Sequence, residues 1–348
     1  MLTAIADVEA LEECVGSRPP GWHLKSIDHL DEHCETLLKA APFAVVGVVV
    51  GDGSVHTTSI GGEPGVVAVS SQRELALPHL ANLDAPDGSG VSFLAFVPGY
   101  RETLRINGYL RSGGRVVEVE EAFLHCAKAV IRSHLWDPAP APTTWLPIAA
   151  SNTEAGDLTS PHIAAFLAAC PLVVVSSRDD QGSADTSPKG DPPGSVIQVL
   201  DHRTVAIADR PGNRRTDTMH NLMSCDAISV LALIPGSDHV VEVRGRAIVT
   251  DDAAVRAGFS VNDKVPKAAI VVTADHVEMR HEAGLAAASL WDVTRHVDPD
   301  SLPKSTRIWV DQVKRNNDRG LAAAAGRKMV NAKMLEIGIA KDYRDNLY

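Results

Sequence analysis

The chain of 348 residues contains an internal repeat, and a repeat constrains the possible folds more than any single motif does. Residues 41–65, APFAVVGVVVGDGSVHTTSIGGEPG, align with residues 170–194, CPLVVVSSRDDQGSADTSPKGDPPG. Each segment has an apolar β-rich run, a turn centred on glycine, a second strand and a corner of glycine and proline. We therefore expect two copies of one folding unit.

Further collinear matches extend the repeat. Residues 93–110 align with residues 230–247 as hairpins of alternating pattern, and HLWD at 134–137 aligns with SLWD at 289–292. A short helical pattern ends at Pro42 in one copy and at Pro171 in the other. Convergent hairpin composition is the alternative explanation. Many short strands with few helices indicate an antiparallel barrel in each half.

These patterns predict a mainly β fold with flanking helices (α+β), in which two tandem split β-barrels form an intramolecular pseudo-dimer. We expect the first copy at residues 1–140, the second at 141–297 and a helical extension at 298–348. The proline-rich stretch 137–147 is the expected linker. The extension is rich in alanine and charge, which favours one or two helices that cover the barrels or a second subunit. In the second arrangement the chain forms a homodimer through these helices.

Composition excludes several classes of protein. A formal charge of −11 with no basic stripe argues against nucleic-acid binding. No apolar run approaches the roughly 20 residues of a membrane helix, and the acidic beginning is unlike a signal peptide, so we expect a cytoplasmic protein. The five cysteines are scattered without a C-x-x-C pair, which predicts reduced thiols and no metal centre.

Two basic segments stand out against this acidic background. TSPKGDPPG, residues 186–194, places Lys189 in a stiff corner, and DRPGNRR, residues 209–215, adds three arginines. The second segment predicts a tight turn followed by a helix with Asn213 as its N-cap. Guanidinium groups beside the free N–H groups of a helix start would bind a phosphate. Arginines that are simply solvated at a helix start are the alternative.

Three segments of the sequence resemble those of a known protein family. SPKGDPPG, DRPGNRRTDT and VEVEEAFLHCAKAVIRSHLWDP (residues 117–138) resemble signature segments of the pyridoxamine 5'-phosphate oxidase-like FMN-binding split-barrel family. Residues 27–43 also resemble the first helix of one subgroup. The resemblance covers residues 26–292 as two tandem copies and excludes the extension. It implies FMN between two barrels, with its phosphate held by basic residues.

The resemblance also implies which residues contact the cofactor. Segments of the second copy supply Thr186, Ser187, Pro188, Lys189, Arg210, Asn213, Arg214 and Arg215. His125, Cys126 and Lys128 approach from the other barrel. Cys126 at a strand-to-helix junction is more typical of a packed thiol than of a nucleophile, so we assign it no covalent role.

The predicted function is that of an FMN-dependent oxidoreductase acting on a small organic molecule, with a nicotinamide donor or oxygen as electron partner. The sequence identifies neither catalytic residues nor the substrate. The alternative is a non-catalytic protein that binds flavin, haem or a deazaflavin. A phosphate-ester hydrolase is the weakest hypothesis, because no paired carboxylates, metal ligands or nucleophile occur at useful spacing.

Complementary losses in the two copies predict one FMN per chain. In the sequence alignment, Gly61 of the first copy takes the place of Lys189. The segment HLANLDAPDGSG of the first copy is shorter than the aligned DRPGNRRTDTMHNLMSCDAI and has Asp84 and Asp87 but no arginine. The second copy has VEMRHEAG where the first has AFLHCAKA, with Gly284 aligned to Lys128. We expect the two carboxylates to repel a phosphate and the C-terminal helices to fill the vacated groove.

Overall fold

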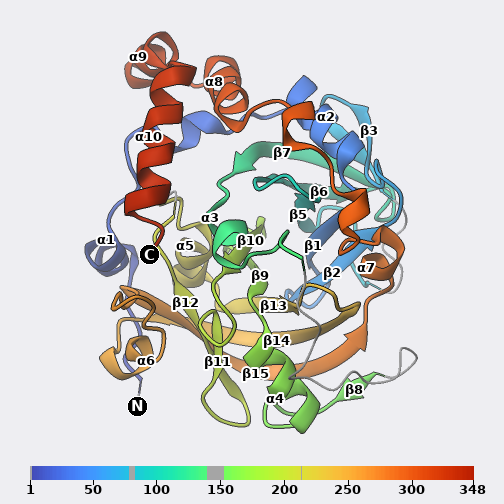
Figure 1. Cartoon of the computed structure of the whole chain (residues 1–348), viewed down its shortest axis with the longest axis vertical. Helices are drawn as coiled ribbons and strands as arrows, with labels where there is room; N and C mark the ends of the chain where they lie inside the picture. The colour runs from blue at the N-terminus through green and yellow to red at the C-terminus, as the bar shows by residue number, and fades with distance from the viewer. Residues whose placement is uncertain (1, 78–82, 139–152, 213) are drawn as a thin grey trace.

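The computed structural model describes residues 2–77, 83–138, 153–212 and 214–348. Two antiparallel sheets, one from each half of the chain, lie one above the other (Figure 1). Each half has an apolar core of its own, and a smaller apolar cluster joins the two halves. Helices flank both sheets, and the C-terminal helices lie along one side and over the top of the first sheet. The predicted class, mainly β with flanking helices, is confirmed.

The first sheet has the strand order β2-β1-β5-β6-β7-β4-β3. Its strands are β1 (Phe43–Val49), β2 (Val55–Gly61), β3 (Ala68–Ser71), β4 (Glu74–Ala76), β5 (Gly90–Phe96), β6 (Thr103–Arg111) and β7 (Val116–His125).

The second sheet has the order β10-β9-β13-β14-β15-β12-β11, which matches the first sheet strand for strand. Its strands are β9 (Leu172–Arg178), β10 (Ala184–Gly190), β11 (Ile197–Val199), β12 (Thr204–Asp209), β13 (Ala227–Leu233), β14 (His239–Thr250) and β15 (Ala268–His281), and a short strand β8 (Glu154–Ala155) also pairs with β15. This is the arrangement expected of two tandem split barrels.

The matched sequence HLWD and SLWD has a structural reason. The indole of Trp136 donates a hydrogen bond to the carbonyl of Tyr100 at 2.8 Å, and the indole of Trp291 makes the same contact with Ser237, also at 2.8 Å. Tyr100 and Ser237 follow the two Pro-Gly turns that align in sequence. The two halves therefore share a tertiary contact as well as a strand order, as duplicated units would.

The apolar run FAVVGVV of β1 is buried on both faces. Successive side chains of a strand point to opposite sides, and Ala44, Val46 and Val48 pack into the core of the first half. Phe43 and Val45 face the other way, into a core shared with β9 and β13 of the second half. The shared core explains why both halves carry unbroken apolar strands instead of an alternating pattern.

A short helix from each half packs on a strand of the other half. Helix α3 (Lys128–Arg132) contacts β10, and helix α7 (Ala283–Ala288) contacts β2. Glycine permits both approaches: a Cβ on Gly190 would lie 2.0 Å from the carbonyl oxygen of Ala129, and a Cβ on Gly61 would lie 1.8 Å from that of Gly284. The pseudo-symmetric crossing brings the end of β7 beside the corner of β10.

The other helices cover the sheets and their edges. They are α1 (Val8–Val15), η1 (Trp22–Lys25), α2 (Glu32–Ala40), α4 (Pro161–Ala169), α5 (Asp217–Ser224), α6 (Ala253–Ala257), η2 (Val293–Arg295), η3 (Pro299–Ser301), α8 (Ser305–Arg315), α9 (Leu321–Met329) and α10 (Ala332–Asp345). Among the residues described, no helix has the length and apolarity to cross a membrane.

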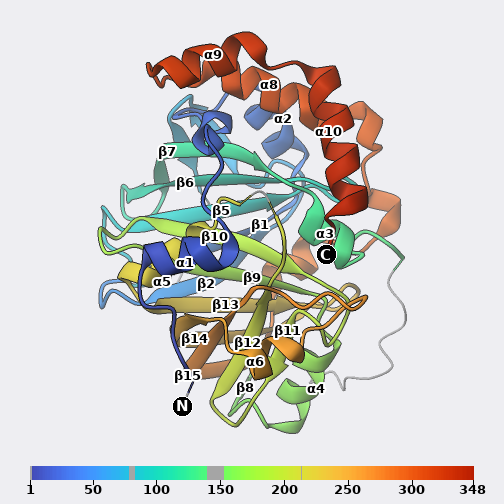
Figure 2. The same ribbon diagram turned by 90° about the vertical axis from the view of Figure 1, so that its left-hand side faces the viewer.

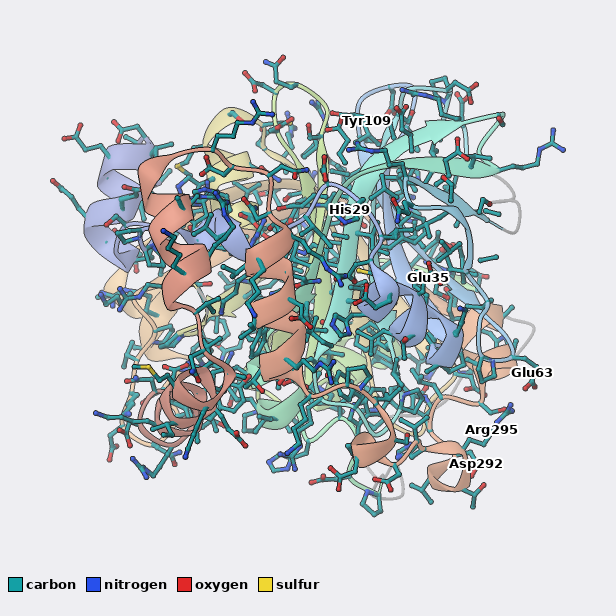
Figure 3. The ribbon with its side chains drawn as sticks, turned by 90° about the horizontal axis from the view of Figure 1, so that it is seen from above. His29, Glu35, Glu63, Tyr109, Asp292 and Arg295 are labelled. Atoms are coloured by element: carbon teal, nitrogen blue, oxygen red, sulfur yellow. The ribbon has the colours of Figure 1, made fainter. Side chains whose placement is uncertain are left out.

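Contacts after β15 return the chain to the first half. Arg295 pairs with Glu63 at 2.7 Å (Figure 3), and the amide of Val297 donates to the carbonyl of Pro98. Helix α8 then packs on β7, and α10 descends beside the sheets to end near α3 (Figure 2). The extension is thus helical, but its helices lie over the first sheet and at the junction of the two halves. The expectation that they fill a vacated groove is wrong.

The predicted domain boundary at residues 140 and 141 and most of the predicted linker lie outside the described residues, and the boundaries remain a prediction.

Candidate functional site

A cavity of about 350 Å³, here called the central pocket, lies where β10 and α5 of the second half meet β7 and α3 of the first. Nine of the eleven predicted cofactor contacts line it: His125, Cys126, Lys128, Ser187, Pro188, Lys189, Arg210, Arg214 and Arg215. Two halves of the chain therefore build one pocket. Asn213 lies outside the described residues, and Thr186 is absent from the lining.

Strand β10 supplies one wall. Ser187 and Lys189 share one face of the strand, and the Lys189 amine pairs with Asp209 of β12 at 2.9 Å. Thr186 points the other way, where its hydroxyl bonds Ser176 at 3.1 Å and the backbone of Ser92. The alternation of a strand thus assigns Thr186 to the junction of the two sheets and Ser187 to the pocket.

The arginine loop differs from the predicted helix start. Helix α5 begins at Asp217, and its N-cap is Thr216, which has a left-handed backbone (φ 54°) and no capping side-chain hydrogen bond. The prediction of Asn213 as N-cap is therefore wrong in position. In the same loop, Arg214 also adopts a positive φ of 57°. Arg214 is exposed at the pocket, and no ion pair of its guanidinium occurs within the described part of the chain.

Arg210 is held by its own half of the chain. Its Nε donates to Asp191 at 2.5 Å, and its Nη2 donates to the carbonyl of Phe259 at 2.7 Å. Burial raises the pKa of Asp191, although Arg210 acts against this shift. Arg210 therefore presents only part of its guanidinium to the pocket and contributes mainly positive potential.

Arg215 is buried in a network that joins both halves. It donates to Asp217, to Ser26 and to Glu121 of β7, each at 2.7 Å. Its guanidinium carbon lies 3.8 Å from the ring centroid of Phe123. Burial alone would lower the pKa of Arg215, but the two carboxylates together raise it. The sequence predicts Arg215 as a cofactor contact; in the structure, these hydrogen bonds hold the loop against the first sheet.

The first half contributes His125, Cys126 and Lys128. Burial and the nearby Arg105 cation lower the pKa of His125 to about 3, so its imidazole is neutral at physiological pH. Lys128 is buried, and its amine contacts Asp342 of α10 at 2.8 Å and the carbonyl of Asn346 at 2.9 Å. The extension thereby closes one side of the pocket.

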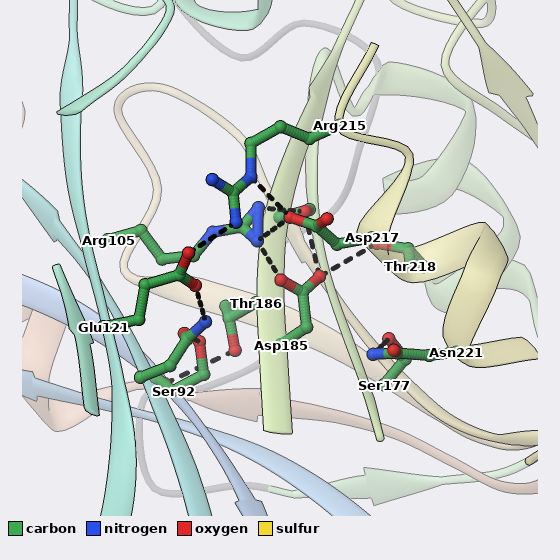
Figure 4. Close-up of polar contacts among 12 residues, drawn as sticks. Ser92, Arg105, Glu121, Ser177, Asp185, Thr186, Arg215, Asp217, Thr218 and Asn221 are labelled. Carbon is green, nitrogen blue, oxygen red and sulfur yellow. Dashed lines mark hydrogen bonds and ion pairs between the residues drawn. The ribbon is translucent and has the colours of Figure 1, made fainter. Parts of the chain in front are cut away.

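A buried charge cluster beneath the pocket was missed by sequence reasoning (Figure 4). Arg105 of β6 forms ion pairs with Asp185 and, at 3.2 Å, with Asp217, and donates to the Ser187 hydroxyl at 2.6 Å. Burial lowers the pKa of Arg105 to about 10. One signal was available: in the aligned hairpins, a charged residue occupies the same strand position, Arg105 in the first and Glu242 in the second.

The lining chemistry fits a phosphate-bearing cofactor. Eight lysine or arginine residues and four aspartates line the pocket. Lys267 and Arg214 are both exposed, and the structure pairs neither with a carboxylate among its described residues. The Nε of Arg105 is a buried donor with no hydrogen-bond partner in the described chain. An anionic ligand with acceptor oxygens would meet both features. FMN has this chemistry.

The pseudo-symmetric position, here called the opposite site, is the place where β2 of the first half meets the end of β15. Ile60 pairs with Ala44 of β1, and Lys189 pairs with Val173 of β9. Ala44 and Val173 are equivalent positions of the repeat, so Ile60 is the structural equivalent of Lys189. The Gly284–Gly61 and Ala129–Gly190 contacts likewise align Ala283 with Lys128. The sequence alignment was wrong by one residue at both positions, but the loss of both lysines stands.

Arg280 occupies the opposite site. It contacts Glu242 at 2.7 Å, Glu282 at 3.2 Å and Glu278 at 3.4 Å. Asp84 and Asp87 are remote from this place. Gly51 donates to the backbone of Asp84 at the other end of β2 from Ile60, and Asp87 accepts from the amides of Ser112 and Gly113 in the β6–β7 turn. The proposed repulsion by these two carboxylates is therefore wrong, and Arg280 with its three carboxylates is what distinguishes the site.

Among the described residues, no group of three or more histidine, cysteine, aspartate or glutamate side chains is arranged to hold a metal ion. 

Comparison with known proteins matches residues 159–281 to a family model described as pyridoxamine 5'-phosphate oxidase. No curated protein matches the chain. Solved structures align weakly. HupZ of Group A Streptococcus has 16% identity, 31% of this chain and 82% of that chain covered, and a TM-score of 0.26. General Stress Protein 26 of Bacillus anthracis has 14% identity, with 33% of this chain and 88% of that chain covered and a TM-score of 0.27. The FAD binding protein of Mycobacterium smegmatis has 16% identity, with 36% of this chain and 96% of that chain covered and a TM-score of 0.26.

Proposed function

We propose that this chain, whose residues 159–281 form a domain of the pyridoxamine 5'-phosphate oxidase family, binds one FMN in the central pocket and uses it to oxidise or reduce a small organic molecule. The observation that carries the proposal is the meeting of the two predicted half-sites, β10 with the arginine loop and β7 with α3, around one cavity. A flavin, when bound, supplies the electron-transfer chemistry.

The roles of the residues follow from their surroundings. Arg214 and Lys189 are the groups best placed to hold the phosphate, because Arg214 has no ion pair within the described chain and Lys189 stays partly exposed. Arg210 and Arg215 set the positive potential and fix the loop. The neutral imidazole of His125 can hydrogen-bond a ligand without adding charge.

The flavin stoichiometry tests the proposal. Titration of the purified protein with FMN, followed by flavin fluorescence, is expected to saturate at one FMN per chain. Arg214→Ala should weaken FMN binding by about 10- to 100-fold, the value of a charge-assisted hydrogen bond, without changing the melting temperature. Arg115→Ala, which removes an exposed arginine from the β6–β7 turn of the first half, is the matched control and should bind FMN as the wild type does.

Two results would contradict the proposal: saturation at two FMN per chain, or no FMN bound at all. Catalysis is tested separately on the loaded protein. Reduction of the bound flavin by a nicotinamide donor, or its rapid reoxidation by oxygen, supports the oxidoreductase. A loaded protein that is inert to both supports a flavin-binding protein without redox turnover.

A further inference from the structure

A second cavity of about 180 Å³ adjoins the central pocket. Apart from Arg215, its lining residues lie outside the family match: Pro19 and Trp22 precede the first sheet, and Trp309 belongs to α8. Cys126 and Arg215 line both cavities. The N-terminal segment and the helical extension therefore build a small compartment directly beside the place proposed for the flavin.

This compartment is lined by cations and aromatic rings without any acid. The amine of Lys25 lies 4.7 Å from the ring centroid of Trp309, and no ion pair of Lys25 is found among the described residues. The guanidinium carbon of Arg215 lies 4.8 Å from the Trp22 ring centroid. None of the residues lining the compartment is aspartate or glutamate, whereas four aspartates line the central pocket.

Charge and size together define what would bind there. Lys25 is half-buried against an indole and has no carboxylate partner among the described residues, and its partial burial lowers its pKa. A carboxylate of a ligand can supply that partner. Apolar cavities of roughly 150 Å³ hold a molecule the size of benzene, so the compartment has room for about one ring.

We infer that this compartment binds a small flat organic acid of about one ring, with Lys25 as the anchor of its carboxylate, and that this acid is the substrate class of the flavin site. The second part rests on the proposed function; binding of the acid does not. Trp309 and Trp22 then act as apolar walls, and Arg215 lies where the compartment adjoins the central pocket.

Isothermal titration calorimetry with benzoate tests the site in the full-length protein without flavin. Benzoate is expected to bind saturably, and benzamide, the neutral analogue of the same shape, to bind at least about tenfold more weakly. Lys25→Gln should weaken benzoate by about 10- to 100-fold, whereas Lys25→Arg should retain most of the binding because it keeps the charge. Lys39→Gln, at an exposed lysine of α2, is the matched control and should bind as the wild type does.

The inference is overturned if benzoate does not bind, if benzamide binds equally well, or if folded Lys25→Gln binds benzoate like the wild type. The Lys25→Arg variant covers the case in which Lys25→Gln does not fold, because loss of binding in a folded Lys25→Arg protein would also count against it.

A titration of the FMN-loaded protein separates the substrate role from the site itself. Benzoate should then shift the flavin absorption spectrum, since Arg215 and Cys126 line both cavities. An unchanged spectrum overturns the substrate role. If FMN does not bind, the proposed function fails while calorimetry with benzoate still decides whether the acid site exists.

Discussion

The central pocket and the opposite site use the same strand positions with different charges. Arg105 of β6 aligns with Glu242 of β14, and His125 of β7 aligns with Arg280 of β15, because the strand registers match. In the central pocket, the basic side chains lie around a cavity and bind carboxylates in its walls. In the opposite site, one arginine reaches inward and binds three glutamates.

One scaffold therefore carries a basic pocket at one position and an internally paired arginine at the equivalent position. The strand order and the crossing helices are the same in both places. The difference lies in a few side chains. Lys189 of β10 has Ile60 of β2 as its equivalent, and His125 at the end of β7 has Arg280 of β15 as its equivalent. The positive charge of Arg280 is paired with carboxylates of the chain, so this arginine does not need an anionic ligand.

The largest expected effect is on the buried ion pairs. Arg105→Met should lower the free energy of unfolding by about 3–5 kcal/mol, because Asp185 would keep only hydroxyl partners in a buried place. Glu242→Met at the opposite site should cost less, about 1–2 kcal/mol, since Arg280 retains Glu278 and Glu282. Urea unfolding of both variants measures the difference. Equal losses would show that the two networks are equivalent.

A smaller effect is expected at the two glycines where α3 and α7 cross. Gly190→Ala and Gly61→Ala each force a Cβ against a backbone carbonyl oxygen and should each lower the free energy of unfolding by about 1–3 kcal/mol. FMN binding should weaken only in Gly190→Ala, because only that glycine seats the helix that carries Lys128. Weaker FMN binding in Gly61→Ala at a temperature where it is fully folded would break the comparison.

The smallest effect is the pH dependence of stability that His125 contributes. Its pKa is about 3 in the folded protein and near 6.5 when unfolded, so between these values only the unfolded state binds the proton. The free energy of unfolding therefore falls as the pH falls through this window. Between pH 6.5 and 5 we expect a loss of about 1–2 kcal/mol, since the side chain faces the pocket and is partly hydrated.

His125→Gln should remove this part of the pH dependence. Unfolding free energies of the wild type and the variant at pH 7, 6 and 5 check it, because the other histidines titrate in both proteins and cancel in the difference. A wild-type minus variant difference that stays constant with pH would contradict the neutral imidazole. Arg280 at the aligned position keeps its charge, since its glutamate partners outweigh burial and raise its pKa.

Most of the fold could be predicted from the sequence. Apolar strands and Pro-Gly turns have local causes and predicted the class and the hairpins, and the composition of residues 298–348 predicted the helical extension. The pocket residues came from signature segments, and nine of the eleven lie together. Arg105 and Asp185 were not predicted, because an isolated charge on a strand has no sequence signal of its partner.

The sequence by itself determined that each half forms an antiparallel sheet and which segments of the two halves line the central pocket, because these properties depend on the local order of residues. Only the tertiary structure decided which charges are free. Lys128, Arg210 and Arg215 are identical in formal charge to Arg214, yet the fold places a carboxylate within 2.8 Å of each of the first three. Partners more than a dozen residues away set the electrostatics, and folding alone brings them within reach.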